Sequence, residues 1–214
     1  MRLTYRCEIL EWNISKAFEI SSLGKHPLQF DDGYEYAPGW RFFVNPGISV
    51  ITCGNIDTNE NRFFCDISCK NELGSLADFP RFVANTKRKG GLELWGFNNI
   101  NFDDKLARAN GLMVVSDGDL QPLIRLSAYG SEEWRDQPTG YNYSLWKIAE
   151  ANGLKEKGAL DYTAKYWQQG DYKRVINDSL HNITVTKQIF KLFEAGELID
   201  PNTERKLQAI KVRF

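Results

Sequence analysis

The chain has 214 residues, of which 42% are hydrophobic and 13% aromatic, and its formal net charge is −1. This apolar content is enough for a packed core and excludes a disordered chain. The near-zero charge excludes a generally basic surface, so binding to nucleic acid would require a local cluster of basic side chains.

The cysteines indicate a reducing compartment. Four cysteines occur without a Cys-x-x-Cys pair, and with only two histidines a structural zinc site is not expected. Cys53 and Cys65 lie in strand-like runs and are typical of buried thiols. The sequence shows neither a signal-peptide core nor an apolar run of about 18 residues. We therefore expect a cytoplasmic protein that does not contact a membrane.

The first 39 residues show little periodicity. Residues 3–10 alternate loosely between apolar and polar types, and residues 24–39 carry the prolines and glycines of a loop. We expect residues 1–39 to form an N-terminal extension laid over a domain that spans residues 40–214.

Three runs rich in aromatic or β-branched residues follow, over residues 40–44, 48–56 and 62–67. Asn45-Pro46-Gly47 separates the first two, and a polar turn over 57–61 separates the second from the third. Such short connections predict an antiparallel meander of three strands.

The rest of the chain is mainly helical. Apolar residues recur at helical spacing from Leu73 to Val83, and a buried strand over 92–95 leads through a turn into a helix at Asp103. Further helices are expected over residues 119–129, 145–152, 160–168 and 171–196, and a last strand over 207–214. Strands followed by a strand–helix unit and a helical half predict an α/β fold with a mixed sheet.

Residues 96–103, Gly-Phe-Asn-Asn-Ile-Asn-Phe-Asp, resemble the second motif of the DnaQ-like 3′–5′ exonucleases. The resemblance is strongest to phage exonuclease-like proteins and to the proofreading domains of family B polymerases. Residues 143–155 are similar to the family's later helix and residues 170–186 to its third motif. The resemblance covers roughly residues 40–196. It implies a ribonuclease H-like mixed sheet, with an antiparallel three-strand meander plus a parallel strand, flanked by helices.

The family holds two Mg²⁺ or Mn²⁺ ions between four carboxylates, two of them from an Asp-x-Glu in the first strand. The resemblance places Asp103 at one metal-binding position. At the third motif, Asn182 stands where the family has its metal-binding Asp, and Asp178 stands where it has a Tyr. Asp178 lies one helical turn from Asn182, so both can share a face.

Two alignments of the first motif are open. One puts Phe43 and Asn45 at the positions of Asp and Glu, and the other puts Glu19 and Ser21 there. We favour the first, because the second leaves a long connection to the next strand. In either alignment at most two of the four carboxylates remain, which leaves most of the charge of two divalent cations uncompensated. We therefore expect at most one weakly held Mg²⁺ or Mn²⁺ ion, at Asp103 with Asp178.

These observations favour a catalytically degenerate exonuclease-like protein, a pseudoenzyme. Its expected partner is single-stranded nucleic acid or a replication or repair protein. The side chains expected to contact nucleic acid lie near the motifs and are Asn98, Asn99, Lys105, Lys147 and Lys173.

Two alternatives remain open at this point. The first is an active metal-dependent 3′–5′ exonuclease with a rearranged site that draws on Glu19, Asp66 or Asp178. The second is a protein-interaction module without nucleic-acid binding, in which residues 1–39 or the loop over 131–141 contact the partner.

Overall fold

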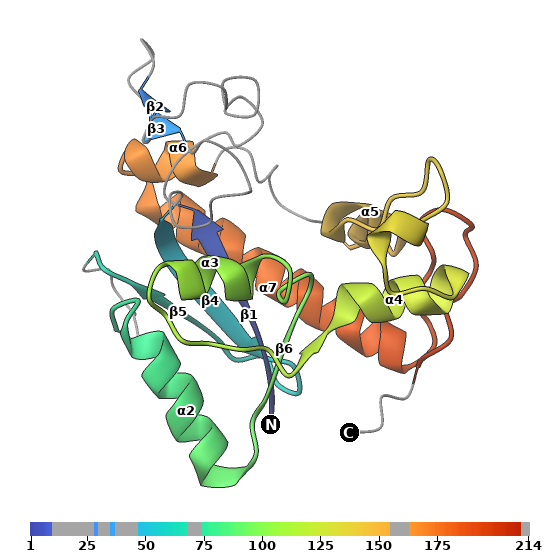
Figure 1. Ribbon diagram of the computed structural model, residues 1–214, viewed down its shortest axis with the longest axis horizontal. Coiled ribbons are helices and arrows are strands. Elements are labelled where there is room, and N and C mark those ends of the chain that lie inside the picture. Colours follow the sequence, from blue (N-terminus) through green and yellow to red (C-terminus); the bar gives the residue numbers. More distant parts are fainter. Residues whose placement is uncertain (10–27, 30–34, 37–46, 68–73, 155–162, 211–214) are drawn as a thin grey trace.

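The computed structural model describes residues 1–9, 28–29, 35–36, 47–67, 74–154 and 163–210. Figure 1 shows a twisted sheet with helices on both faces. The five strands of the sheet, in spatial order, are β5 (Asn61–Cys65), β4 (Ile48–Asn55), β1 (Arg2–Ile9), β6 (Glu93–Gly96) and β7 (Gly118–Asp119). A separate antiparallel pair is formed by β2 (Leu28–Gln29) and β3 (Glu35–Tyr36).

The strand directions match the expected mixed sheet. Strand β4 runs antiparallel to both β1 and β5, whereas β6 is parallel to β1 and β7 is parallel to β6. The predicted combination of an antiparallel three-strand meander with parallel pairing is therefore confirmed, and the α/β fold is consistent with a ribonuclease H-like protein.

The first strand of the meander is not the one expected. Strand β1 lies at the centre of the sheet, where Thr4 pairs with Gly54 on one side and with Trp95 on the other. A boundary at residue 40 would separate this strand from both neighbours, so residues 2–9 belong to the sheet and not to an extension. The strand expected over residues 40–44, like most of the segment 10–39, lies outside the described residues.

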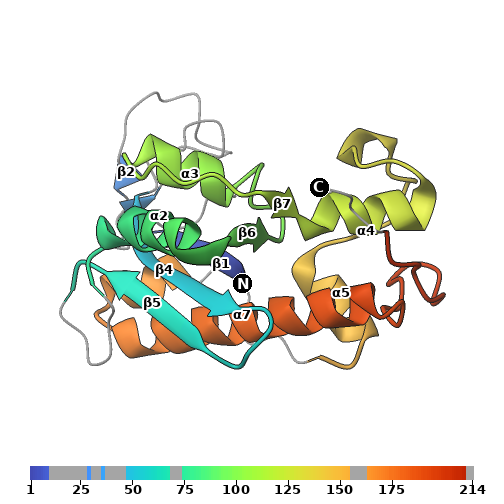
Figure 2. The same cartoon turned by 90° about the horizontal axis from the view of Figure 1, so that it is seen from below.

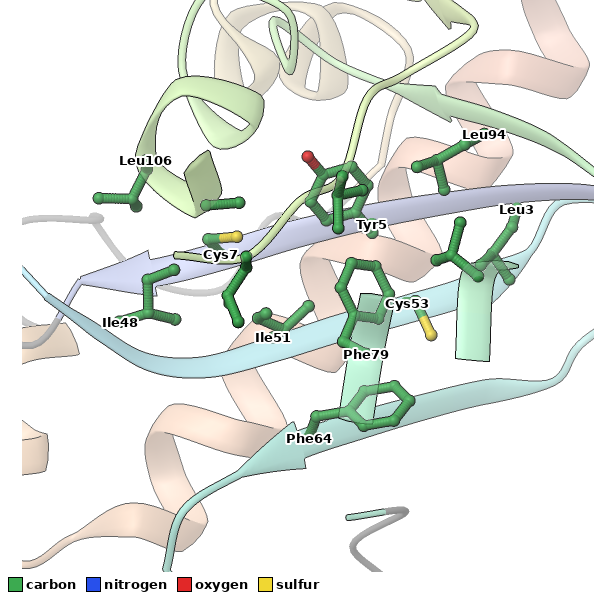
Figure 3. Packing of buried hydrophobic residues seen from close by; sticks show 14 of the residues in the cluster. Leu3, Tyr5, Cys7, Ile48, Ile51, Cys53, Phe64, Phe79, Leu94 and Leu106 are labelled. Carbon is green, nitrogen blue, oxygen red and sulfur yellow. The ribbon is translucent and has the colours of Figure 1, made fainter. Parts of the chain in front are cut away.

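One face of the sheet is covered by α2 (Asp78–Gly90) and α3 (Asp103–Ala109), and Figure 3 shows the core beneath them. The ring of Phe79 lies 5.1 Å from that of Tyr5 and 5.3 Å from that of Phe64. Helix α2 starts later than the apolar spacing indicated. Pro80 therefore falls in its first turn, where the missing backbone N–H costs nothing.

The other face is covered by α7 (Tyr172–Glu194), which crosses β4 and β1. The helix can approach closely because a Cβ at Gly54 would lie 2.6 Å from Ile183 Cγ2. Thr52 Oγ1 and Ser179 Oγ share a hydrogen bond of 2.7 Å across this interface. The short α6 (Thr163–Gln168) precedes α7 and adds Trp167 to the core on this side.

A second core lies beyond β6 and β7, around the C-terminal half of α7 (Figure 2). It includes α4 (Leu120–Tyr129), α5 (Leu145–Ala151) and Trp95, whose ring lies 5.1 Å from that of Phe190. A short 3-10 helix, η2 (Trp134–Asp136), lies in the loop between α4 and α5. The last strand expected over 207–214 is not formed by residues 207–210, and residues 211–214 are not described. Within the described ranges, no helix combines the length and apolar character that a membrane crossing needs.

Candidate functional site

The site forms where β6 ends and leaves the edge of β1 without a neighbouring strand. Of the residues of β1, only residues 2–4 pair with β6. Beyond it, Asn99 Nδ2 donates to the carbonyl oxygen of Tyr5 at 2.9 Å, and the backbone N–H of Cys7 donates to Asp103 Oδ1 at 2.7 Å. Two side chains thus continue the hydrogen-bond ladder and bring Asp103 against the central strand.

Asp103 is the first residue of α3 and is 4% exposed. Burial raises the pKa of its carboxyl from 3.8 to about 7, although the hydrogen bond from Cys7 and the charge of Arg6 act in the opposite direction. The charge of Glu8 contributes to the increase. Asp103 is therefore a buried carboxyl whose charge is destabilised by its surroundings.

Asp104, by contrast, has a structural role. Its carboxylate accepts hydrogen bonds from the Tyr5 hydroxyl and from both the backbone N–H and the hydroxyl of Ser116, the latter two at 2.9 Å. These contacts tie α3 to β1 and to the segment that leads into β7. Three donors leave Asp104 little capacity for a ligand.

The turn over residues 96–102 is shaped by its asparagines. Asn98 adopts a left-handed conformation with φ of 65°, which asparagine tolerates. Asn99 Oδ1 accepts from the backbone N–H of Phe97 at 3.0 Å, and the Asn99 side chain lies so close to Gly96 that a Cβ there would be 1.8 Å from Asn99 Cγ. Asn99 is 1% exposed, so its side chain is not placed for the nucleic-acid contact expected of it.

Asp119, the last residue of β7, binds this turn, and the sequence did not single it out as part of the site. Its carboxylate caps α4 through the backbone N–H of Gln121 at 3.2 Å and accepts from the N–H groups of Asn98 and Ile100 at 2.6 and 3.1 Å. Burial raises its pKa to about 6, and the three backbone hydrogen bonds limit that increase. The sequence predicted Asp119 as the start of α4 because a polar residue precedes the helix, but it did not predict the hydrogen bonds to Asn98 and Ile100.

Asp119→Ala is expected to lower the free energy of unfolding by about 2 kcal/mol, because a helix cap and two turn hydrogen bonds are lost. Urea unfolding measures this loss. A destabilisation below about 0.5 kcal/mol would contradict the role given to Asp119.

Strand β1 contributes two charged side chains to the site, Arg6 and Glu8. Arg6 pairs with Thr52, and Thr52 bonds Ser179 of α7, so the side chains of Arg6 and Glu8 lie on the face that α7 covers. Arg6 Nε lies 2.9 Å from Glu8 Oε1, and the two side chains are 16% and 3% exposed. The pair is in ionic contact, but the N–H is not aimed at the oxygen: Glu8 Oε1 has no hydrogen-bond partner among the described residues.

The first strand of the sheet offers a further candidate for the first motif. On the face toward α7, β1 carries Arg6 and Glu8 two positions apart, which is the spacing of an Asp-x-Glu. Of these two side chains, Glu8 is acidic and Arg6 is basic. The alignments on Asn45 and on Glu19 both fall outside the described residues.

Helix α7 contributes Asn182, which is 4% exposed. Val185 and Ile189 follow Asn182 by three and seven positions, so the three side chains share one face of α7. Val185 and Ile189 lie in the same core cluster as Trp95 of β6, which places Asn182 on the side of α7 toward β6. Within the part of the chain that the structure describes, Asn182 Oδ1 has no hydrogen-bond partner. Asp178, one turn earlier, lies 3.9 Å from Arg174 in an i,i+4 ion pair.

These residues do not fit a pair of divalent cations. No group of three or more His, Cys, Asp or Glu side chains within the described ranges is arranged to hold a metal ion. Glu8 and Asp103 supply at most two negative charges, Asn182 supplies none, and Arg6 adds a positive one. Two divalent cations carry four positive charges. The site offers at most two negative charges, and Arg6 already neutralises one of them.

The expected nucleic-acid contacts are not all brought together. Lys105 on α3 and Lys173 in the first turn of α7 are exposed. Lys147 lies on α5, which Figure 1 and Figure 2 show beside the C-terminal half of α7. Its ammonium is 2.9 Å from Glu150 and lies over the ring of Trp146. The structure thus separates Lys147 from the other two lysines.

Asp66 is also remote from the site. It follows β5, which is separated from β1 by β4, and its carboxylate accepts from the backbone N–H of Leu76 at 2.9 Å. A rearranged site that uses Asp66 together with Asp103 is therefore not supported by the sheet order.

No protein-family model and no curated protein sequence matches the chain. Among solved structures, the chain is similar to the family B DNA polymerase from the hyperthermophilic archaeon Pyrobaculum calidifontis, with a TM-score of 0.50 and 14% sequence identity. The similarity covers 96% of this chain and 26% of the polymerase chain, so this chain spans about a quarter of that protein. At this identity the similarity concerns the fold alone. The chain therefore has an α/β fold, consistent with a ribonuclease H-like sheet, that it shares with one part of a family B DNA polymerase.

Proposed function

We propose that this protein is a catalytically degenerate relative of 3′–5′ exonucleases that binds single-stranded nucleic acid without hydrolysing it. The observation that carries the proposal is the ion pair between Arg6 and Glu8 in the central strand. Together with Asp103 and Asn182, the four positions that resemble a metal site hold two carboxylates, an amide and a guanidinium. The resemblance to proofreading domains and the similarity to a polymerase support a partner in nucleic-acid metabolism.

Metal-dependent phosphodiester hydrolysis requires a bound cation that generates hydroxide and stabilises the charge on the attacked phosphate. A guanidinium supplies positive charge and oriented N–H groups, but it does not activate water in this way. The site of Arg6, Glu8 and Asp103 can therefore hold a phosphate group without cleaving the bond beside it. Lys105 on α3 and Lys173 on α7 are the exposed cations that we expect to contact further phosphates of a bound strand.

The first test is incubation of single-stranded DNA and RNA with the protein and Mg²⁺ or Mn²⁺. We expect no hydrolysis and a binding affinity that falls as salt increases. Lys105→Ala combined with Lys173→Ala should weaken binding and lower the slope of log affinity against log salt by about 1.4, two phosphate contacts in single-stranded nucleic acid. Lys147→Ala is the matched control and should leave both quantities unchanged, because its ammonium is paired with Glu150 on another part of the surface.

Two outcomes contradict the proposal. Hydrolysis that Asp103→Ala abolishes would establish an active exonuclease. Absence of binding at low salt would exclude nucleic acid as the ligand and would favour a protein partner.

A replication or repair protein as partner is the second candidate, and it has its own observation. Trp134 of η2 is 73% exposed, in the loop over residues 131–141 between α4 and α5. Exposed tryptophans are enriched among the residues that dominate protein interfaces. If this candidate holds, Trp134→Ala weakens binding to the partner and leaves the oligonucleotide affinity unchanged.

A further inference from the structure

The central strand of the sheet places a permanent positive charge at the position where an exonuclease-like site would need a negative one. Glu8 is a carboxylate with a side chain 3% exposed, and Arg6 Nε lies 2.9 Å from its Oε1. An unpaired carboxylate at this depth would cost several kcal/mol, so the guanidinium stabilises the charge of Glu8. The same guanidinium charge opposes the rise in the pKa of Asp103, which indicates that it reaches both acidic groups.

We infer that Arg6 is the fixed cation of this site, where its guanidinium takes the place of divalent metal ions and binds a phosphate group of single-stranded nucleic acid. This inference rests on the proposed function and deepens it. It assigns the phosphate contact to one residue and makes binding independent of metal.

Arginine has the geometry for this role. Its guanidinium carries five N–H donors in a planar fork that matches phosphate oxygens. The ion-pair contact with Glu8 is made by Arg6 Nε, so the two terminal nitrogens remain to bind an anion. The side chain is 16% exposed, so the buried carboxylate anchors it while solvent still reaches it.

Asn182 supplies the second, independent observation. Its Oδ1 is buried and has no hydrogen-bond donor among the described residues, which marks an incomplete polar site on the side of α7 toward β6. An amide at this position adds no negative charge that would hold Arg6 away from an anion. A carboxylate there would be a second competitor for the guanidinium, beside Glu8.

The inference is tested first by fluorescence anisotropy with a labelled oligothymidine. The wild-type affinity should be equal in EDTA and in Mg²⁺. Arg6→Gln should weaken binding about tenfold and lower the salt slope by about 0.7, the value for one phosphate contact in a single strand. Arg6→Lys should bind with intermediate affinity, because it keeps the charge but loses the fork.

Arg62→Gln is the matched control. Arg62 is also a strand arginine with a glutamate within ion-pair distance, at 3.8 Å from Glu60. It lies on β5, the edge strand on the side of the sheet away from β6 and β7. It should bind like the wild type. Because Arg6→Gln leaves Glu8 unpaired and can fail to fold, Arg6→Gln combined with Glu8→Gln removes both charges as a neutral pair and should show the same loss of affinity. A wild-type affinity that requires Mg²⁺, or equal effects of Arg6→Gln and Arg62→Gln, would overturn the inference.

A second experiment separates this inference from the proposed function. Arg6→Asp combined with Asn182→Asp places carboxylates at all four positions, and we expect it to bind Mn²⁺ at least tenfold more tightly than the wild type in calorimetric titration. If the wild type does not bind oligonucleotides, the proposed function and the phosphate contact of Arg6 both fail, and a gain in Mn²⁺ affinity would then support only the place of Arg6 at a metal position. Equal Mn²⁺ affinity of the wild type and the double variant would overturn it.

Discussion

Gly96→Ala is expected to destabilise the protein by about 3 kcal/mol or more. A Cβ at this position would lie 1.8 Å from Asn99 Cγ and 2.1 Å from Asn99 Oδ1, so the asparagine side chain must move. The movement breaks the hydrogen bonds from Asn99 Nδ2 to the Tyr5 carbonyl and from the Phe97 N–H to Asn99 Oδ1. Overpacking and two lost buried hydrogen bonds add to this value.

Urea unfolding of the two proteins measures the difference. Gly111→Ala is the control: its Cβ would meet nothing within 4 Å, and only the strain of a φ of +78° remains. That strain costs about 1 kcal/mol. If Gly96→Ala is no more destabilising than Gly111→Ala, the packing of Asn99 against Gly96 does not hold the turn as described.

Asp103→Asn is expected to stabilise the protein at pH 8, by up to about 4 kcal/mol. Burial raises the pKa of Asp103 from 3.8 to about 7, so the folded protein holds a proton that the unfolded chain releases at lower pH. The free energy of unfolding therefore falls as pH rises from about 4 to about 7, and the difference between these pKa values corresponds to about 4 kcal/mol. Asparagine resembles the protonated carboxyl and removes this loss.

The measurement is a series of urea unfolding curves between pH 4 and pH 8. The two proteins should be nearly equal in stability at pH 4 and diverge above it. Asp104→Asn is the control with the opposite sign: at pH 8 it should be less stable than the wild type, because one acceptor oxygen for Tyr5 and Ser116 is lost. A stability difference for Asp103→Asn that does not change with pH would contradict the buried state of this carboxyl.

The fold class was predictable because it depends on local signals. Turn residues separated the strands now seen as β4 and β5, and Asp119 marked the start of α4. The place of β1 at the centre of the sheet was not predicted, because Thr4, Arg6 and Glu8 alternate with apolar residues, as on a strand with one face in water. In the folded chain α7 covers that polar face, and the sequence does not state which helix will cover which strand.

The candidate site was only partly predictable for the same reason. Asp103 could be found from the motif around it, since the whole motif is continuous in sequence. Arg6 and Glu8 lie more than 90 residues earlier, and once residues 40–44 were taken as the first strand they could not be considered. Asn99 shows a further limit of prediction from sequence. An asparagine can bond a buried strand or face solvent, and the residue type alone does not tell which; here Asn99 bonds β1.

The way in which β1 is completed beyond the end of β6 also bears on aggregation. An uncovered strand edge presents N–H and C=O groups that can recruit a strand from another molecule. Here Asn99 donates to the Tyr5 carbonyl and Asp103 accepts from the Cys7 N–H, so the edge of β1 beyond β6 offers neither group to another chain. We therefore expect Asp103→Ala to increase self-association of the folded protein, as measured by light scattering, and Asp103→Asn to leave it unchanged. The carboxyl proposed to have lost its metal would then persist as protection of the strand edge.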